Sequence, residues 1–265
     1  MSIRVAVVGA SGRMGREVVK AVLGADGIEL VATVDVVNIG EEAGSLSGLA
    51  ACGVFVEESL ETALARGNVD ALVDFTIPTS AMANIETSVR HKVPAVVGTT
   101  GLTPADVETI RGWSAEFGTP VFIAPNFAIG AVLMMQFSQQ AAKYLPNVEI
   151  IEIHHERKLD SPSGTALRTA ELIRDSRESS PLPSPANPIE KVAGARGAEF
   201  GEVHIHSVRL PGHVAHQQVI FGGTGETLTI RHDSFDRVSF MPGVIVAVRK
   251  VRDLTGVVIG MENIL

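Results

Sequence analysis

Short apolar runs alternate with longer amphipathic segments over the first half of the chain. The apolar runs are rich in β-branched residues and predict strands at 3–8, 28–34, 70–76, 95–101 (running into a glycine turn) and 121–126. The segments between them predict helices at 16–23, 59–66, 78–91 and 103–117. A short strand is expected at 54–56 and a loop at 40–49. Strands and helices in this alternation form a parallel, doubly wound sheet.

The pattern changes after residue 127. Residues 129–145 predict an apolar helix, and its Met134, Met135 and Phe137 are expected to pack in a core or an interface. Further strands are predicted at 148–153, 202–209, 215–221 and 227–233, with a helix at 166–177 and a proline-rich loop at 179–187. These strands predict a second, α+β domain with a mixed or antiparallel sheet. A helix at 244–251 and an apolar run at 256–260 are expected to return to the first domain.

The first strand passes directly into the glycine turn Gly9-Ala10-Ser11-Gly12-Arg13-Met14-Gly15, and a helix follows. Strand, glycine turn and helix in this order are typical of a dinucleotide fingerprint: Gly9 permits the turn, Gly12 lets the backbone approach a pyrophosphate, and Gly15 lets helix and strand pack closely. Asp35 ends the second predicted strand, where an acidic side chain can bind the ribose hydroxyls. We therefore expect an N-terminal Rossmann-like domain that binds a dinucleotide.

Three later loops are expected to border the same cofactor. Ligands of doubly wound sheets lie beyond the carboxyl ends of the strands. The loops that follow the strands there contain Phe75 and Thr76; Gly98, Thr99 and Thr100; and Ala124, Pro125, Asn126 and Phe127.

The stretch 152–165, Glu-Ile-His-His-Glu-Arg-Lys-Leu-Asp-Ser-Pro-Ser-Gly-Thr, concentrates candidate chemistry between a strand and a helix. His154, His155 and Lys158 supply proton donors or acceptors and positive charge. Backbone N–H groups of Ser163, Gly164 and Thr165 lie at the predicted helix start, which favours an anion. Paired histidines and a Ser-Gly-Thr turn each occur in proteins for structural reasons alone. A structural turn, however, does not require two adjacent imidazoles and a nearby ammonium group. The combination predicts a site that protonates an anionic substrate.

Composition narrows the class of protein. The 265-residue chain is 45% hydrophobic and 5% aromatic, which is typical of aliphatic cores around parallel sheets. A formal net charge of −8 argues against a nucleic-acid or anionic-membrane partner. Cys52 is the only cysteine, so neither an intramolecular disulfide nor a thiolate metal cluster can form, and no metal is expected. No leader or long apolar run precedes the first strand, and we expect a cytoplasmic protein.

Five segments of the chain, in the same order, resemble the 4-hydroxy-tetrahydrodipicolinate reductase family, also called dihydrodipicolinate reductases. They are the glycine turn at 9–15, Asp-Phe-Thr at 74–76, Gly-Thr-Thr-Gly at 98–101, Asn-Phe at 126–127 and the motif at 152–166. Ser161 stands where the family motif usually has alanine, and Val36 where some members carry arginine. The resemblance implies an NADH- or NADPH-dependent enzyme of the diaminopimelate route to lysine. It also implies a homotetramer that assembles through the sheets of its second domains.

The resemblance assigns roles to individual residues. It implies that His154 and Lys158 are catalytic, and that His155, Ser163, Gly164 and Thr165 bind the substrate, a small cyclic dicarboxylate. The residues implied to bind the cofactor are Gly9, Ala10, Ser11, Gly12, Arg13, Met14, Asp35, Gly98, Thr99, Thr100, Ala124, Pro125, Asn126 and Phe127. The expected domains are 1–127 with 233–265 for the dinucleotide, and 128–232 for substrate and oligomerisation.

Two other functions share part of this pattern. Another Rossmann oxidoreductase, such as an amino-acid dehydrogenase, would keep the first domain without needing the His-His to Ser-Gly-Thr motif. A nucleotide-sensing protein would keep the glycines and lose the proton donors. His154, His155 and Lys158 count against both alternatives.

The sequence also favours NADH at least as much as NADPH. Asp35 would accept a hydrogen bond from a ribose hydroxyl and repel a 2′-phosphate. No lysine or arginine occurs between Asp35 and Arg66 to relieve that repulsion, although Arg13 and Arg16 lie in or just after the glycine turn.

Overall fold

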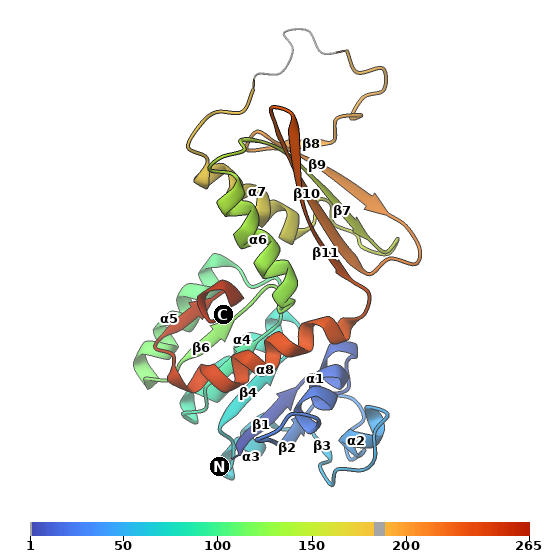
Figure 1. Ribbon diagram of the computed structural model, residues 1–265. Coiled ribbons are helices and arrows are strands. Elements are labelled where there is room, and N and C mark those ends of the chain that lie inside the picture. Colours follow the sequence, from blue (N-terminus) through green and yellow to red (C-terminus); the bar gives the residue numbers. More distant parts are fainter. Residues whose placement is uncertain (1, 183–188) are drawn as a thin grey trace. The chain divides into compact units, whose positions relative to one another are not determined.

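A computed structural model describes residues 2–182 and 189–265. The chain forms two compact units, Met1–Ile129 with Phe240–Leu265, and Gly130–Ser239 (Figure 1). The return to the first unit comes at Phe240, after the last strand of the second unit has ended at Ser234, whereas the sequence placed it at residue 233. Most of the loop predicted at 179–187 lies outside the described residues. No helix in the described part of the chain is long and apolar enough to span a membrane.

The first unit contains a seven-stranded parallel sheet in the order β12-β6-β5-β4-β1-β2-β3. Its strands are β1 (Ile3–Val8), β2 (Ile28–Val34), β3 (Val56–Glu57), β4 (Ala71–Asp74), β5 (Ala95–Val97), β6 (Val121–Ile123) and β12 (Val257–Ile259). The predicted Rossmann-like sheet is thus confirmed. The order reverses between β1 and β4, and ligands of such sheets bind beside that reversal, at the carboxyl ends of the strands.

Helices cover both faces of this sheet (Figure 1). Alternate strand residues such as Val8 and Leu72 pack against Ile85 and Ile110 on one face. The helices are α1 (Arg13–Leu23), α2 (Ala43–Leu46), α3 (Leu60–Ala65), α4 (Pro78–Arg90), α5 (Pro104–Phe117) and α8 (Met241–Lys250), with the 3-10 helices η2 (Val251–Asp253) and η3 (Met261–Asn263). The 3-10 helix η1 (Arg237–Phe240) spans the point where the chain passes from the second unit to the first. Two local predictions were wrong: α1 begins directly after Gly12, and the segment expected to be a loop at 40–49 contains α2.

The second unit contains a five-stranded sheet in the order β11-β10-β7-β9-β8. β7 and β9 are parallel and the other pairs antiparallel, which confirms the predicted mixed sheet. The elements are α6 (Ile129–Ala141), β7 (Asn147–His154), α7 (Gly164–Ser176), β8 (Ala198–Phe200), β9 (Val203–Arg209), β10 (Ala215–Gly223) and β11 (Glu226–Ser234). Along β7 the buried residues Val148, Ile150 and Glu152 alternate with half-buried ones, so one face of the sheet forms the core of the unit. β8 was not predicted.

Candidate active site

The glycine turn connects β1 to α1. At two of its positions, Gly9 and Gly15, the surrounding backbone leaves no room for a side chain. Gly9 has a φ of 78°, and a Cβ atom there would lie 2.5 Å from the carbonyl oxygen of Phe75. A Cβ atom on Gly15 would lie 1.9 Å from the carbonyl oxygen of Gly9. Gly12 is the N-cap of α1, and no side chain among the described residues caps this helix. The first N–H groups of α1 are therefore directed at a space that suits an anion such as a pyrophosphate.

Asp35 lies against this turn. Its Oδ2 accepts a hydrogen bond from the Ser11 backbone N–H at 2.9 Å, and its Oδ1 accepts from the N–H groups of Val36 at 2.7 Å and Val37 at 3.2 Å. The Ser11 hydroxyl donates to the Val37 carbonyl, and Arg16 Nε donates to the Ser11 carbonyl. The carboxylate is thus held at a fixed distance from the turn, next to the exposed side chain of Val36.

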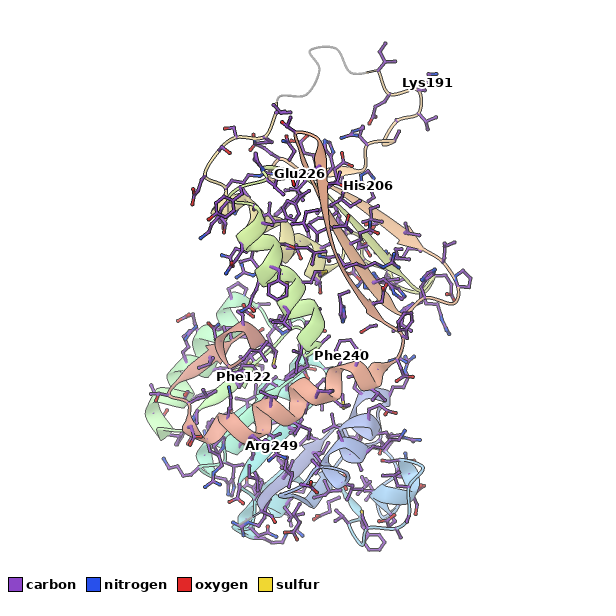
Figure 2. The ribbon with its side chains drawn as sticks, viewed as in Figure 1. Phe122, Lys191, His206, Glu226, Phe240 and Arg249 are labelled. Carbon is purple, nitrogen blue, oxygen red and sulfur yellow. The ribbon has the colours of Figure 1, made fainter. Side chains whose placement is uncertain are left out.

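A pocket of about 280 Å³ lies at the carboxyl ends of β4, β5 and β6. Its lining includes most of the residues predicted on those loops, together with one residue of α1, Met14: the loop residues are Phe75, Thr76, Gly98, Thr99, Thr100, Pro125, Asn126 and Phe127. Ala124 is only 1% exposed and is not among the residues that line this pocket. Phe240, which directly precedes α8 (Figure 2), completes the pocket and was not predicted, since no local motif marks it.

Asp74 organises the two loops that line this pocket. Its fully buried carboxylate accepts hydrogen bonds from the Thr76 N–H and hydroxyl, the Thr99 hydroxyl and the Asn84 side-chain amide, at 2.7–3.1 Å. The Thr99 hydroxyl oxygen also accepts from the Thr76 N–H at 2.8 Å. The sequence pointed to Asp74 only as part of a motif. It anchors both loops because β4 and β5 are neighbours in the sheet, and the motif does not specify that pairing.

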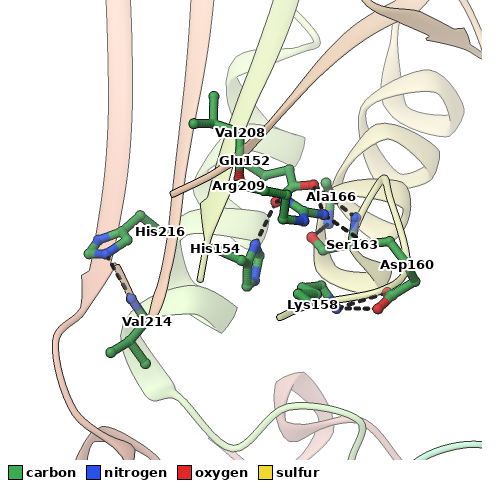
Figure 3. A network of polar contacts seen from close by, with 10 residues as sticks. All are labelled: Glu152, His154, Lys158, Asp160, Ser163, Ala166, Val208, Arg209, Val214 and His216. Carbon is green, nitrogen blue, oxygen red and sulfur yellow. Dashed lines mark hydrogen bonds and ion pairs between the residues drawn. The ribbon is translucent and has the colours of Figure 1, made fainter. Parts of the chain in front are cut away.

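In the second unit, a second buried carboxylate, that of Glu152, is hydrogen-bonded to His154 (Figure 3). Glu152 Oε2 accepts hydrogen bonds from His154 Nδ1 at 2.5 Å and from Arg209 Nη1 at 2.8 Å. Glu152 Oε1 accepts from Arg209 Nη2 at 2.8 Å and from the Ser163 N–H at 3.3 Å. Burial by itself would raise the pKa of Glu152, but the hydrogen bonds from His154 and Arg209 outweigh it and lower that pKa to about 2.

The ionised Glu152 carboxylate determines which ring nitrogen of His154 carries the proton when the imidazole is neutral. A carboxylate has no proton to donate, so Nδ1 of His154 must be the donor in their hydrogen bond. Nε2 of the neutral ring then carries the lone pair, and in the protonated ring it carries the proton that can be given away. The His154 side chain is 15% exposed. This geometry is suited to a general acid or base that exchanges its proton at Nε2.

The loop after β7 holds the remaining predicted residues. Lys158 Nζ donates to both oxygens of Asp160, at 2.7 and 2.8 Å, and this hydrogen bond lowers the pKa of Asp160. Ser163 is the N-cap of α7, with its hydroxyl accepting from the Ala166 N–H and its own N–H donating to Glu152. Both groups of Ser163 are therefore used within the protein, and Gly164 begins the helix beside it. Nδ1 of His155 is buried with no partner among the described residues.

Two family descriptions together match nearly the whole chain. "Dihydrodipicolinate reductase, N-terminus" matches residues 3–127, and "Dihydrodipicolinate reductase, C-terminus" matches residues 130–265. The chain belongs to the dihydrodipicolinate reductase family. The resemblance inferred from the sequence motifs is thereby confirmed.

Curated relatives cover the full length of this dihydrodipicolinate reductase family member. The 4-hydroxy-tetrahydrodipicolinate reductase of Moorella thermoacetica is 49% identical over 100% of this chain and 98% of its own. That of Halalkalibacterium halodurans is 51% identical over 99% of each chain. The solved structure described as dipicolinate-bound dihydrodipicolinate reductase from Paenisporosarcina sp. TG-14 has a TM-score of 0.88 and 43% identity, and each chain is covered completely.

More distant structures share only the fold with this reductase family member. The amine dehydrogenase of Mycobacterium smegmatis has a TM-score of 0.69 at 14% identity, over 97% of this chain and 95% of its own. The sequence left open that the chain is another Rossmann oxidoreductase, such as an amino-acid dehydrogenase. The similarity to such enzymes is limited to the fold. The chain is an oxidoreductase whose N-terminal unit is a nucleotide-binding Rossmann domain.

Proposed function

We propose that the chain reduces 4-hydroxy-tetrahydrodipicolinate to tetrahydrodipicolinate in the diaminopimelate route to lysine. The observation that carries this proposal is the pairing of His154 with the buried Glu152 carboxylate, directly beside the Ser163–Gly164 start of α7. A proton donor and an anion-binding helix start are thus joined in one unit. Both are required to reduce a ring that bears two carboxylates. The Paenisporosarcina relative, described as dipicolinate-bound, supports a cyclic dicarboxylate as the substrate.

The chain's own residues bind the substrate and supply the proton. Overall, the substrate gains one hydride and one proton and loses one water molecule; the hydride comes from the nicotinamide cofactor. His154 Nε2 provides a proton as negative charge develops on the ring, and the Lys158 ammonium acts as a second donor. Gly164 and Thr165 bind a substrate carboxylate with backbone N–H groups at the helix start, and His155 adds an imidazole. General acid catalysis of this kind accounts for about 10² to 10⁴ in rate.

NADH or NADPH is the proposed cofactor, and the first unit fits it. The Gly9–Gly15 turn has no room for a Cβ at positions 9 and 15, and the first turn of α1 lacks a side-chain cap among the described residues. We assign the pyrophosphate to this turn, residues Gly9 to Met14, and the adenosine ribose to Asp35. The nicotinamide is assigned to the pocket formed by Gly98–Thr100 and Pro125–Phe127, next in sequence to the buried Ala124.

We expect the enzyme to use NADH at least as well as NADPH. A 2′-phosphate about 5 Å from the Asp35 carboxylate would be repelled by roughly 3 kcal/mol at an effective dielectric of about 20, before solvent reduces that figure. Asp35 cannot turn away easily, since three backbone N–H groups hold it. Val36→Arg places a cation on a side chain that is 82% exposed, and should shift kcat/KM toward NADPH.

The cofactor preference is measured as kcat/KM for NADH and for NADPH at low salt, in the wild type and in Val36→Arg. Leu49→Arg is the control, because it adds the same charge at another exposed apolar residue of the same unit. A wild-type preference for NADPH of tenfold or more would show that Arg13 or Arg16 outweighs Asp35.

Oxidation of NADH with the freshly made product of the preceding synthase tests the proposed reaction. Turnover is expected with this compound and not with plain 2-oxo acids, which an amino-acid dehydrogenase would reduce. Pyridine-2,6-dicarboxylate, a planar ring with both carboxylates, should compete with the substrate. Turnover of 2-oxo acids alone would reject the proposal, and lack of competition would place the anion site elsewhere.

The proposed assembly is a homotetramer formed through the five-stranded sheets, in the cytoplasm. Ile151, Ile153 and Ile220 are only half buried on the sheet face opposite the core residues Val148 and Ile150, so they can pack against another copy. Light scattering of the purified protein measures this assembly directly. The cytoplasmic assignment is supported by the single cysteine, which fits a reducing compartment.

A further inference from the structure

Glu152 connects three segments of the second unit through one carboxylate group (Figure 3). His154 lies two residues further along β7, Arg209 ends β9, and Ser163 caps α7. Each carboxylate oxygen accepts two hydrogen bonds, one of them from Arg209. The proton donor and the helix start therefore share the same anchor.

Arg209 keeps this anchor in place. Its two Nη atoms also donate to the carbonyl oxygens of Val208 and Asp160, at 2.8 and 2.7 Å. The guanidinium thus links the end of β9 to the loop that carries Lys158 and Asp160. A bidentate arginine restricts the carboxylate in both distance and angle. Glu152 is completely buried, so it cannot contact substrate and cannot act as an acid or base on it directly.

We propose that Glu152 is the positioning residue of this site. It fixes His154 in the Nδ1–H form, so that Nε2 alone exchanges the proton, and it holds the imidazole at a constant distance from the anion-binding start of α7. This inference rests on the proposed reductase function and extends it to a residue that does not touch the substrate. The physical reason is that an imidazole with a fixed partner does not have to reorient before each proton transfer.

Glu149 provides a matched comparison on the same strand. It also bonds to a histidine and an arginine: His206 Nε2 lies 2.8 Å from its carboxylate, and Arg196 pairs with it. His206 lies on β9 (Figure 2). Glu149 lies three positions before Glu152 along β7, so it lies on the opposite face of the sheet, half buried and away from α7. The substitution Glu149→Gln removes the same charge without affecting the His154 anchor.

The experiment compares Glu152→Gln with Glu149→Gln. In Glu152→Gln we expect the amide oxygen to take the place of Oε1, where the Ser163 N–H and Arg209 Nη2 both need an acceptor. The amide NH₂ then takes the place of Oε2 and faces His154, which favours the Nε2–H form of the ring because a neutral imidazole can change its tautomer and a backbone N–H cannot. We expect kcat to fall by about 100-fold, in the range seen when partners that orient a functional histidine are removed. KM should rise only a few-fold, and Glu149→Gln should retain wild-type kcat. Glu152→Asp, which keeps the charge, should recover part of the lost turnover.

Nitrogen-15 NMR of the wild-type protein tests the same proposal without any substrate. The His154 ring should be in the Nδ1–H form in the wild type and in the Glu149→Gln variant, and in the Nε2–H form in Glu152→Gln. An Nε2–H ring in the wild type would overturn the proposal even if Glu152→Gln failed to fold. Equal turnover of the two glutamine variants would also overturn it. An Nδ1–H ring in a wild-type protein that does not reduce the substrate would instead reject the proposed function alone.

Discussion

His154→Gln should lower kcat by about 100-fold or more, while the affinity for NADH changes by no more than a few-fold. Glutamine retains polarity at this position but cannot deliver a proton at neutral pH. The residue belongs to the second unit, and the glycine turn and Asp35 belong to the first, so NADH binding should be preserved. Steady-state kinetics measures kcat, and fluorescence titration with NADH measures the affinity.

His206→Gln is the control for this variant. His206 is also a half-buried histidine bonded to a glutamate, but it lies on β9 and bonds to Glu149 on the other face of the sheet. It should retain wild-type kcat. Lys158→Ala should likewise lower kcat by about 100-fold, since it removes the second proposed donor. Near-normal turnover in both His154→Gln and Lys158→Ala would contradict the catalytic assignment.

Gly15→Ala should prevent tight cofactor binding and destabilise the first unit by about 3 kcal/mol. The added Cβ would lie 1.9 Å from the Gly9 carbonyl oxygen and 2.8 Å from the Ala10 Cα, so the backbone of the turn must move. Inserting one carbon into a packed site costs roughly 1 to 3 kcal/mol, and contact with backbone places this case at the upper end. The displaced N–H groups of α1 would also no longer converge on the pyrophosphate.

Gly112→Ala makes the same change in another helix and should have the opposite effect. Gly112 lies within α5, and beyond the nearby backbone of that helix a Cβ there would meet no described atom within 4 Å. Alanine in an open helix position is about 1 kcal/mol more favourable than glycine. Thermal unfolding and NADH titration of both variants give the comparison. If Gly15→Ala bound NADH as tightly as Gly112→Ala does, the close approach at Gly15 would have no functional importance.

The chemistry of both units could be predicted from sequence wherever it depends on residues that are neighbours along the chain. The turn from Gly9 to Gly15 must be glycine-rich, because its own backbone crowds the positions of the side chains. His154, Lys158 and Gly164 lie within one strand, loop and helix start, so their common location follows from local structure. The alternation of apolar runs and helices was enough to predict the parallel sheet, since it fixes which faces must be buried.

The residues that hold these functional groups in place could be identified only from the tertiary structure. Arg209 is 57 positions away from Glu152, and they meet because β9 pairs in parallel with β7 in a register that places Arg209 beside His154. Asp74 anchors Thr99 because β4 and β5 are neighbours, and Phe240 reaches the pocket only after the chain has left the second unit. Apolar periodicity determines which face of a strand is buried, but many strand pairings bury the same faces. The packing of the whole domain selects one of these strand pairings. That pairing also determines which buried carboxylates contact the functional groups.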